Sequence, residues 1–308
     1  MRNPERRNAG LRRLVGMGLW LLVGLGGRAE AGMTYLALGD SITFGVGANN
    51  SPTDVSDGDR GYVAGYADVL RARSGYDRPK VINLAVSGET SSSFFGNGSG
   101  IDGPNAALRN THYSGPTPMS QYQMMLNTIQ SELAAGNTIG TVTMTLGAND
   151  LFAALANNQS PLAALATFQA NELKLLTTIR TLLPTTNLVL LGYFDPYAPF
   201  VNDSTSPFYA IANQSALAIP AINAYIQGDA AAFGASYVDL FHPFQGKELA
   251  DTYIYPTGNV HPTVEGYALI TSAVASVPEP GSVVLLGIGL VGASAVARHR
   301  GARRAAAA

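Results

Sequence analysis

The sequence contains no cysteine among its 308 residues. This absence excludes disulfide bonds, thiolate metal sites and a cysteine nucleophile. Histidine is also scarce, with four copies, so very few side chains can act as a base near neutral pH.

Positive charge is scarce in the central part of the chain. Between residues 32 and 276 there are nine basic and eighteen acidic residues, a net charge of −9, and the other ten basic residues lie near the two ends. A body this acidic repels phosphate backbones, which argues against nucleic-acid binding.

Residues 1–31 have the pattern of a signal peptide. Arg12 and Arg13 precede the apolar run 14–27, and Ala29-Glu30-Ala31 follows it as a small-residue cleavage site. The run is short for a transmembrane helix, which needs roughly 17 to 25 residues. We therefore predict that the chain is exported.

Residues 277–308 form a second targeting segment. Val277-Pro278-Glu279-Pro280 precedes an uncharged stretch, 281–297, and then four arginines, which positive-inside behaviour would keep in the cytoplasm. This tail resembles the PEP-CTERM sorting signal of Gram-negative bacteria. The resemblance implies export across the inner membrane, transient anchoring through the tail, removal of the tail by an exosortase, and delivery to the cell surface or the extracellular matrix. A plain membrane anchor is the alternative.

The body, residues 32–276, alternates short apolar runs with longer helical patterns. This alternation predicts one domain, an α/β three-layer α/β/α sandwich with about five parallel strands. Long segments rich in Gly, Ser, Asn and Pro, 45–62 and 91–118, are predicted to be loops. The strands are expected at 35–38, 81–84, 141–146, 188–193 and 237–240, and the helices at 63–73, 119–135, 161–183, 207–227 and 262–275.

Three of the predicted strands end in unusual polar sequences. Parallel strands bring their carboxyl ends to one edge of the sheet, so Ser41, Gly88 and Asn149 should meet there. An acyl-transfer site needs a hydroxyl nucleophile, a base and donors for an oxyanion. Ser41 can supply the hydroxyl, while its own N–H, the N–H of Gly88 and the amide of Asn149 can supply the donors.

Among the four histidines, His261 is the best candidate for the base. Pro262 suits the first position of a helix and Glu265 suits its first turn, so we expect His261 at a helix start. His242 is the competitor, but its apolar flanks favour a packed or surface role. His112 and His299 lie in a loop and in the tail.

Together these motifs resemble the SGNH (GDSL) hydrolase family. Gly39-Asp40-Ser41, Gly88, Gly147-x-Asn149-Asp150 and Val260-His261-Pro262 match its four blocks in order. The resemblance implies a flavodoxin-like sandwich with Ser41 as nucleophile, His261 as base, and Ser41, Gly88 and Asn149 as the oxyanion hole. It also implies ester hydrolysis with no metal and no organic cofactor.

One position departs from the family pattern. The family commonly has an aspartate three residues before its histidine, and this sequence has Gly258 there. Asn259, a backbone carbonyl or Asp251 could orient the ring instead, or the site could be impaired. Asp40 and Asp150, which lie beside motif residues, are expected to stiffen their turns through hydrogen bonds.

The predicted function is an exported carboxylic ester hydrolase that is acylated on Ser41. Its substrate could be a small ester, a lipid or an O-acetylated polysaccharide, and Phe94 and Phe95 could form an apolar rim or pack on their own domain. The alternative is a catalytically impaired surface protein that binds glycan or matrix.

Overall fold

The structure is a computed structural model that describes residues 32–49, 60–75, 77–96, 119–157 and 159–277. The predicted signal peptide, the predicted membrane segment 281–297 and most of the two predicted long loops lie outside these residues. Within the described part of the chain, no helix combines the length and the apolar character needed to cross a membrane.

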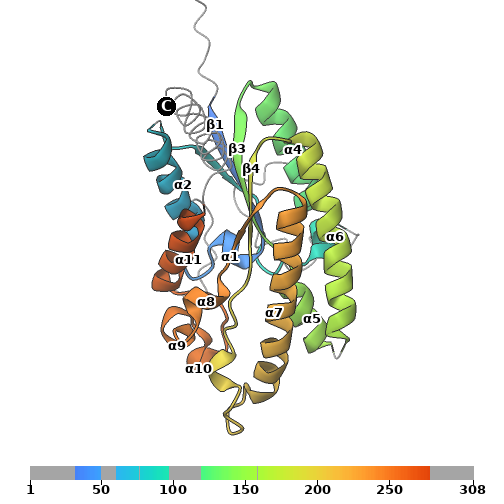
Figure 1. Ribbon diagram of the computed structural model, residues 1–308, viewed down its shortest axis with the longest axis vertical. Helices are drawn as coiled ribbons and strands as arrows, with labels where there is room; N and C mark the ends of the chain where they lie inside the picture. The colour runs from blue at the N-terminus through green and yellow to red at the C-terminus, as the bar shows by residue number, and fades with distance from the viewer. Residues whose placement is uncertain (1–31, 50–59, 76, 97–118, 158, 278–308) are drawn as a thin grey trace, which may run out of the picture. The chain divides into compact units, whose positions relative to one another are not determined.

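The centre of the domain is a parallel sheet of five strands in the order β2-β1-β3-β4-β5 (Figure 1). This order is the flavodoxin-like one, and it confirms the predicted fold class. Each predicted strand overlaps an observed one. The strands are β1 (Met33–Gly39), β2 (Lys80–Asn83), β3 (Thr138–Thr145), β4 (Asn187–Leu191) and β5 (Ser236–Val238).

The two faces of the sheet bury two separate apolar clusters. In β1, Leu36 and Leu38 point into one cluster and Tyr35 and Ala37 into the other, as the two-residue period of a strand requires. The helices α4 (Gln121–Ala134), α6 (Pro161–Leu182) and α7 (Tyr209–Ala232) cover the first face, and α2 (Gly61–Ser74) and α11 (Val264–Ser276) cover the second (Figure 1). The result is the predicted three-layer sandwich.

Several short helices were not predicted, and most of them have only three or four residues, too few to show a helical period. Each lies between a strand and the long helix that follows it. They are α1 (Ser41–Phe44), α3 (Ser91–Phe94), α5 (Ala148–Ala156), α8 (Phe241–Phe244), α9 (Glu248–Asp251), α10 (Ile254–Thr257) and the 3₁₀ helix η2 (Ala198–Phe200).

Helix α11 begins two residues later than expected. Its N-cap is Thr263, whose hydroxyl accepts from the backbone N–H of Gly266. Pro262 instead forms an antiparallel bridge with Thr252. His261 therefore lies in an extended segment that precedes the helix, rather than at the helix start.

Candidate active site

The turn after β1 requires glycine at its first position. Gly39 has a φ of +127°, and a Cβ placed on it would lie 1.9 Å from the carbonyl oxygen of Thr145. No other residue fits this position, because β3 approaches the backbone too closely. The chain turns here from the strand directly into α1.

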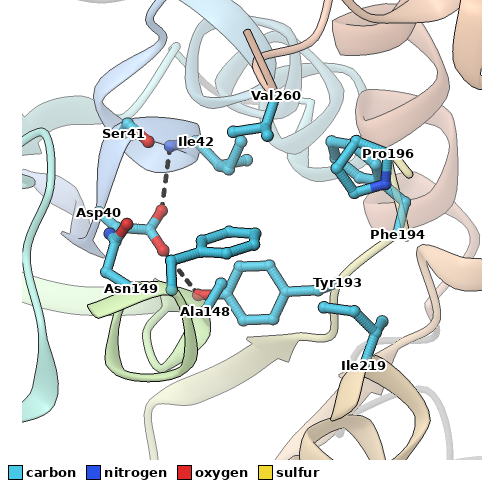
Figure 2. A pocket seen from close by; sticks show the side chains of 11 residues that line it. Asp40, Ser41, Ile42, Ala148, Asn149, Tyr193, Phe194, Pro196, Ile219 and Val260 are labelled. Atoms are coloured by element: carbon cyan, nitrogen blue, oxygen red, sulfur yellow. Dashed lines mark hydrogen bonds between the residues drawn. The ribbon is translucent and has the colours of Figure 1, made fainter. Parts of the chain in front are cut away.

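Asp40 caps the helix that begins at Ser41. Its carboxylate accepts from the backbone N–H of Ile42 at 3.0 Å and from the hydroxyl of Tyr193 at 2.6 Å (Figure 2). It also accepts from the hydroxyl of Thr145 at 2.8 Å. Burial raises the pKa of Asp40 to about 6, although these three donors favour the ionised form. The contacts agree with the structural role that the sequence suggested for Asp40.

Ser41 is the first residue of α1 and is 8% exposed. Its carbonyl accepts from the backbone N–H groups of Gly45 and Val46, at 3.0 and 3.1 Å, which fixes the backbone that carries the side chain. Ser41 and Asn149 both line one pocket, and Figure 2 shows them on the same side of it as Asp40. Two of the three predicted oxyanion residues are thus brought together.

Asn149 lies in the first turn of α5 and connects that helix to the loop containing Gly88. Its Nδ2 donates to the backbone carbonyl of Glu89 at 2.9 Å. Beside it, Asp150 accepts from the backbone N–H and the hydroxyl of Ser91, at 2.8 and 2.6 Å, and burial raises its pKa. Asp150 thus ties α5 to the Gly88 loop rather than stiffening only its own turn.

A buried clamp that the sequence did not reveal joins this loop to the end of β1. Gln121 accepts from the N–H of Gly39 at 2.6 Å, and its Nε2 donates to the carbonyl of Gly39 and to the carboxylate of Glu89, both at 2.9 Å. Gln121 and Glu89 are 0% and 1% exposed. The clamp therefore fixes the Ser41 turn relative to the loop of Gly88.

His261 is partly buried, and its ring is bonded to Asn259. The ring Nδ1 and the backbone N–H of His261 lie 2.6 and 3.0 Å from Asn259 Oδ1. Two donors converge on this atom, as expected for an amide oxygen, so Nδ1 carries the ring proton and Nε2 keeps its lone pair. Burial lowers the pKa of His261 to about 4, which favours the neutral ring.

The segment that carries His261 is anchored at several points. The carbonyl of His261 accepts from Tyr253 N–H at 2.9 Å, and the carbonyl of Asp251 accepts from Thr263 N–H at 2.9 Å. Further along, the hydroxyl of Tyr267 donates to the carbonyl of Val46 at 2.9 Å. The first two bonds join the segment to residues 251–253, and the third joins α11 to the chain that leaves α1. Asp251 takes part through its backbone, whereas Asn259 contacts the imidazole.

Gly258, at the position of the missing family aspartate, ends α10. It has a φ of +74°, and its N–H donates to the carbonyl of Ile254 at 2.7 Å. A Cβ placed on Gly258 would lie 3.1 Å from the ring of Phe208. A left-handed helix end explains a glycine here.

Other candidates from the sequence lie elsewhere. His242 is exposed, pairs with Asp239 and lines a different pocket, while His112 and His299 lie outside the described residues. Phe94 is buried in the core and Phe95 packs on Tyr122, so these two rings pack on their own domain. Among the described residues, no three His, Asp or Glu side chains are grouped as a metal site would need.

The pocket beside Ser41 is mainly apolar, and most of its walls come from residues that belong to no recognisable sequence motif. They follow β4 or lie on α5 and α7, where an apolar residue looks like any other core residue. The lining residues are Asp40, Ser41, Ile42, Ala148, Asn149, Phe152, Tyr193, Phe194, Pro196, Ile219 and Val260.

Several solved structures share this fold. A lipase from a goat rumen metagenome is 20% identical with a TM-score of 0.54, covering 79% of this chain and 97% of its own. A protein described as a GDSL-like lipase from Parabacteroides merdae is 17% identical with a TM-score of 0.50, covering 79% and 94%. A catalytic mutant of an acetylxylan esterase from Geobacillus stearothermophilus is 17% identical with a TM-score of 0.50, covering 80% and 96%.

Comparison at the level of sequence separates the body from the tail. The sequence matches no curated protein. Residues 276–301 match the PEP-CTERM protein-sorting motif, which indicates export and membrane anchoring in a Gram-negative bacterium. Residues 37–269, most of the chain, match the model of the GDSL-like lipase/acylhydrolase family. The chain therefore belongs to the GDSL-like lipase/acylhydrolase family and is a hydrolase that acts on ester bonds.

Proposed function

We propose that the chain is an exported serine esterase with Ser41 as nucleophile and His261 as general base. The observation that carries the proposal is the pocket in which Ser41 and Asn149 meet beside Val260, the neighbour of His261 in the chain. The bond from His261 Nδ1 to Asn259 supports it further, because a base must present the lone pair of its other nitrogen.

The reaction would run through an acyl-enzyme on Ser41. The hydroxyl oxygen attacks the ester carbonyl carbon while its proton moves to Nε2 of His261. The tetrahedral intermediate then expels the alcohol, which takes that proton. A water molecule, deprotonated by the same nitrogen, attacks the acyl-enzyme and releases the acid, and the proton returns to Ser41.

The oxyanion would be held by the backbone N–H groups of Ser41 and Gly88 and by the amide of Asn149. One hydrogen of Asn149 Nδ2 is used by the carbonyl of Glu89, and an amide nitrogen carries a second one. Each donor of this kind contributes about 2.7–4 kcal/mol to the transition state. The Gln121 clamp would keep the Gly88 loop at a fixed distance from Ser41.

Asn259 is proposed as the residue that orients His261, in place of the family aspartate. A neutral amide can fix the ring proton on Nδ1, but it stabilises the imidazolium less than a carboxylate would. We therefore expect a working site whose base is weaker than one paired with an acid. Asp251, the other residue considered from the sequence, is the alternative that mutagenesis can test.

Export would be followed by processing of the tail. The PEP-CTERM motif supports a membrane-anchored intermediate from which an exosortase removes the tail, so that the acidic body reaches the cell surface or the extracellular matrix. Ester groups on surface polysaccharides or on lipids would then be within reach.

A serine-directed fluorophosphonate probe tests the proposal on the full-length chain. We expect labelling of the wild type, loss of labelling in Ser41→Ala and strong reduction in His261→Ala. Ser272→Ala, which changes an exposed serine on α11, is the matched control and should label normally. A folded wild-type protein that is never labelled would favour the non-catalytic surface protein instead.

A further inference from the structure

The pocket beside Ser41 is small, and apolar side chains form most of its walls. We propose that it is an acyl pocket that accepts an acetyl group and excludes longer acyl chains, so that the substrates are acetyl esters. This inference rests on the proposed role of Ser41 and adds the substrate class.

Few polar groups of the pocket are available to bind a substrate, and they suit a single ester carbonyl. Both carboxylate oxygens of Asp40 are already bonded to donors, and the hydroxyl of Tyr193 is one of these donors. Ser41 and Asn149 remain to contact a substrate. A sugar hydroxyl placed inside would lose its hydrogen bonds to water without replacement, so the apolar half of the ester belongs in the pocket.

The remaining walls are apolar and come from five parts of the fold. Val260 lines the pocket and precedes His261, which must give a proton to the departing alcohol. The alcohol half of the ester therefore lies on the Val260 side, outside the pocket. Figure 2 shows Phe194, Pro196 and Ile219 across the pocket from Ser41 and Asn149. The apolar lining residues are Ile42, Ala148, Phe152, Phe194, Pro196, Ile219 and Val260.

The volume of the pocket sets the length of the acyl chain. The cavity measures about 30 Å³, and roughly 10–15 Å³ is the least that holds one water molecule. A space of this small size suits the methyl group of an acetyl ester. A butyryl or octanoyl chain would need its walls to move apart.

The walls are held by the core behind them. Ile219 is 2% exposed and Phe194 is 4% exposed, and the ring of Phe194 stacks on that of Phe244 with 4.1 Å between centroids. Phe152 contacts Tyr197 edge-on, at 6.3 Å between centroids. Because interiors are close-packed, the buried Ile219 and Phe194 cannot move apart without opening voids elsewhere.

The test measures kcat/KM of the full-length chain with acetyl, butyryl and octanoyl esters of one alcohol. In a pocket of fixed size, each extra methylene changes kcat/KM by about 10–200-fold. We expect the acetyl ester to exceed the octanoyl ester by about 100-fold or more. Ile219→Ala, which shortens one side chain of the far wall, should reduce this ratio by about tenfold or more.

Ile222→Ala is the matched control. Ile222 lies on α7, one turn from Ile219, and is 0% exposed, but it does not line the pocket. It should lower stability as Ile219→Ala does and leave the acyl preference unchanged. If the alanine variants do not fold, Ile219→Val and Ile222→Val make the same comparison with a smaller loss of volume.

Two results would overturn the inference and leave the proposed function standing. One is a wild type that is labelled at Ser41 and yet hydrolyses octanoyl esters as fast as acetyl esters. The other is an equal change of preference in Ile219→Ala and Ile222→Ala. Absence of both labelling and hydrolysis across the series would overturn the proposed function and this inference together.

Discussion

The imidazole of His261 donates from Nδ1 to the side-chain oxygen of Asn259, 2.6 Å away, within the same short turn of the chain. Asn259 Oδ1 also accepts the backbone N–H of His261 at 3.0 Å. An amide thus occupies the place where a carboxylate would contact the ring, and this difference has consequences that can be measured.

Replacing Asn259 by alanine should reduce ester turnover strongly. Loss of the orienting residue lets the ring take the wrong tautomer, which costs about 10⁴ in the serine proteases that define this role. We expect a loss of about 10²–10⁴ in kcat/KM for Asn259→Ala, with the fold retained by circular dichroism. Asp251→Asn is the comparison variant and should stay close to wild type. The opposite ranking would assign the orienting role to Asp251.

The fall of kcat/KM on the acid side of its pH profile should occur at an unusually low pH. Burial lowers the pKa of His261 to about 4, so the free base persists well below pH 6.5. We expect kcat/KM to fall only as the pH drops toward about 4, measured with a substrate whose detection does not depend on pH.

Asn259→Asp should shift this limb upward. A carboxylate beside the ring favours its protonated form, which raises the pKa of His261. Asn259→Ala serves as the control, because it removes the hydrogen bond without adding charge. A limb that stays in place in Asn259→Asp would mean that another group controls the profile.

Gly258→Asp should not restore a triad. A side chain in the left-handed region costs about 1–2 kcal/mol, and at this position the Cβ would also crowd Phe208. Gly75→Asp separates the two effects, since Gly75 also ends a helix with a φ of +68° but has no atom within 4 Å of an added Cβ. We expect Gly258→Asp to lower the free energy of unfolding more than Gly75→Asp. Increased turnover in Gly258→Asp would contradict this account.

Tyr193→Phe should destabilise the protein more at high pH. Because burial raises the pKa of Asp40 to about 6, its contribution to stability is largest at acid pH and is lost as the pH rises through about 6. The Tyr193 hydroxyl moderates this loss by donating to the ionised carboxylate. Removing a hydrogen bond to a charged group costs about 1.5–3 kcal/mol, so we expect this cost at pH 8 and a smaller one at pH 5, from urea unfolding.

Tyr35→Phe is the control for that measurement. Tyr35 is also a buried tyrosine, and its hydroxyl bonds to the neutral hydroxyl of Thr143 at 2.8 Å. Its loss should cost about 0.5–1.5 kcal/mol, equally at both pH values. An equal pH dependence in the two variants would separate Tyr193 from the ionisation of Asp40.

The sequence predicted the sheet well because its strands are short runs of apolar and β-branched residues. The three central strands are mostly buried, and such runs stand out between polar loops. Helix α5 was missed because its beginning, Gly147-Ala148-Asn149-Asp150, also has the composition of a turn. The local sequence is compatible with a turn and with a helix start, and packing against α6 and α7 favours the helix.

The sequence points to the motif residues of the candidate site. It does not point to the residues that hold them in position. Ser41, Gly88, Asn149 and His261 stand out because polar residues follow predicted strands or precede a predicted helix. Gln121 does not, since it lies 82 positions from Gly39 and bonds to it only in the folded chain. Tertiary contacts of this kind leave no mark in local sequence.

Because Asn259 and His261 are only two residues apart, they should move together as one rigid segment. An acid supplied from a distant strand must be kept in register with its histidine whenever either element shifts. Here any drift of the segment would carry both partners along, so the proton would stay on the same nitrogen. Only one gap, from the imidazole to the serine oxygen, is then left for the rest of the protein to control.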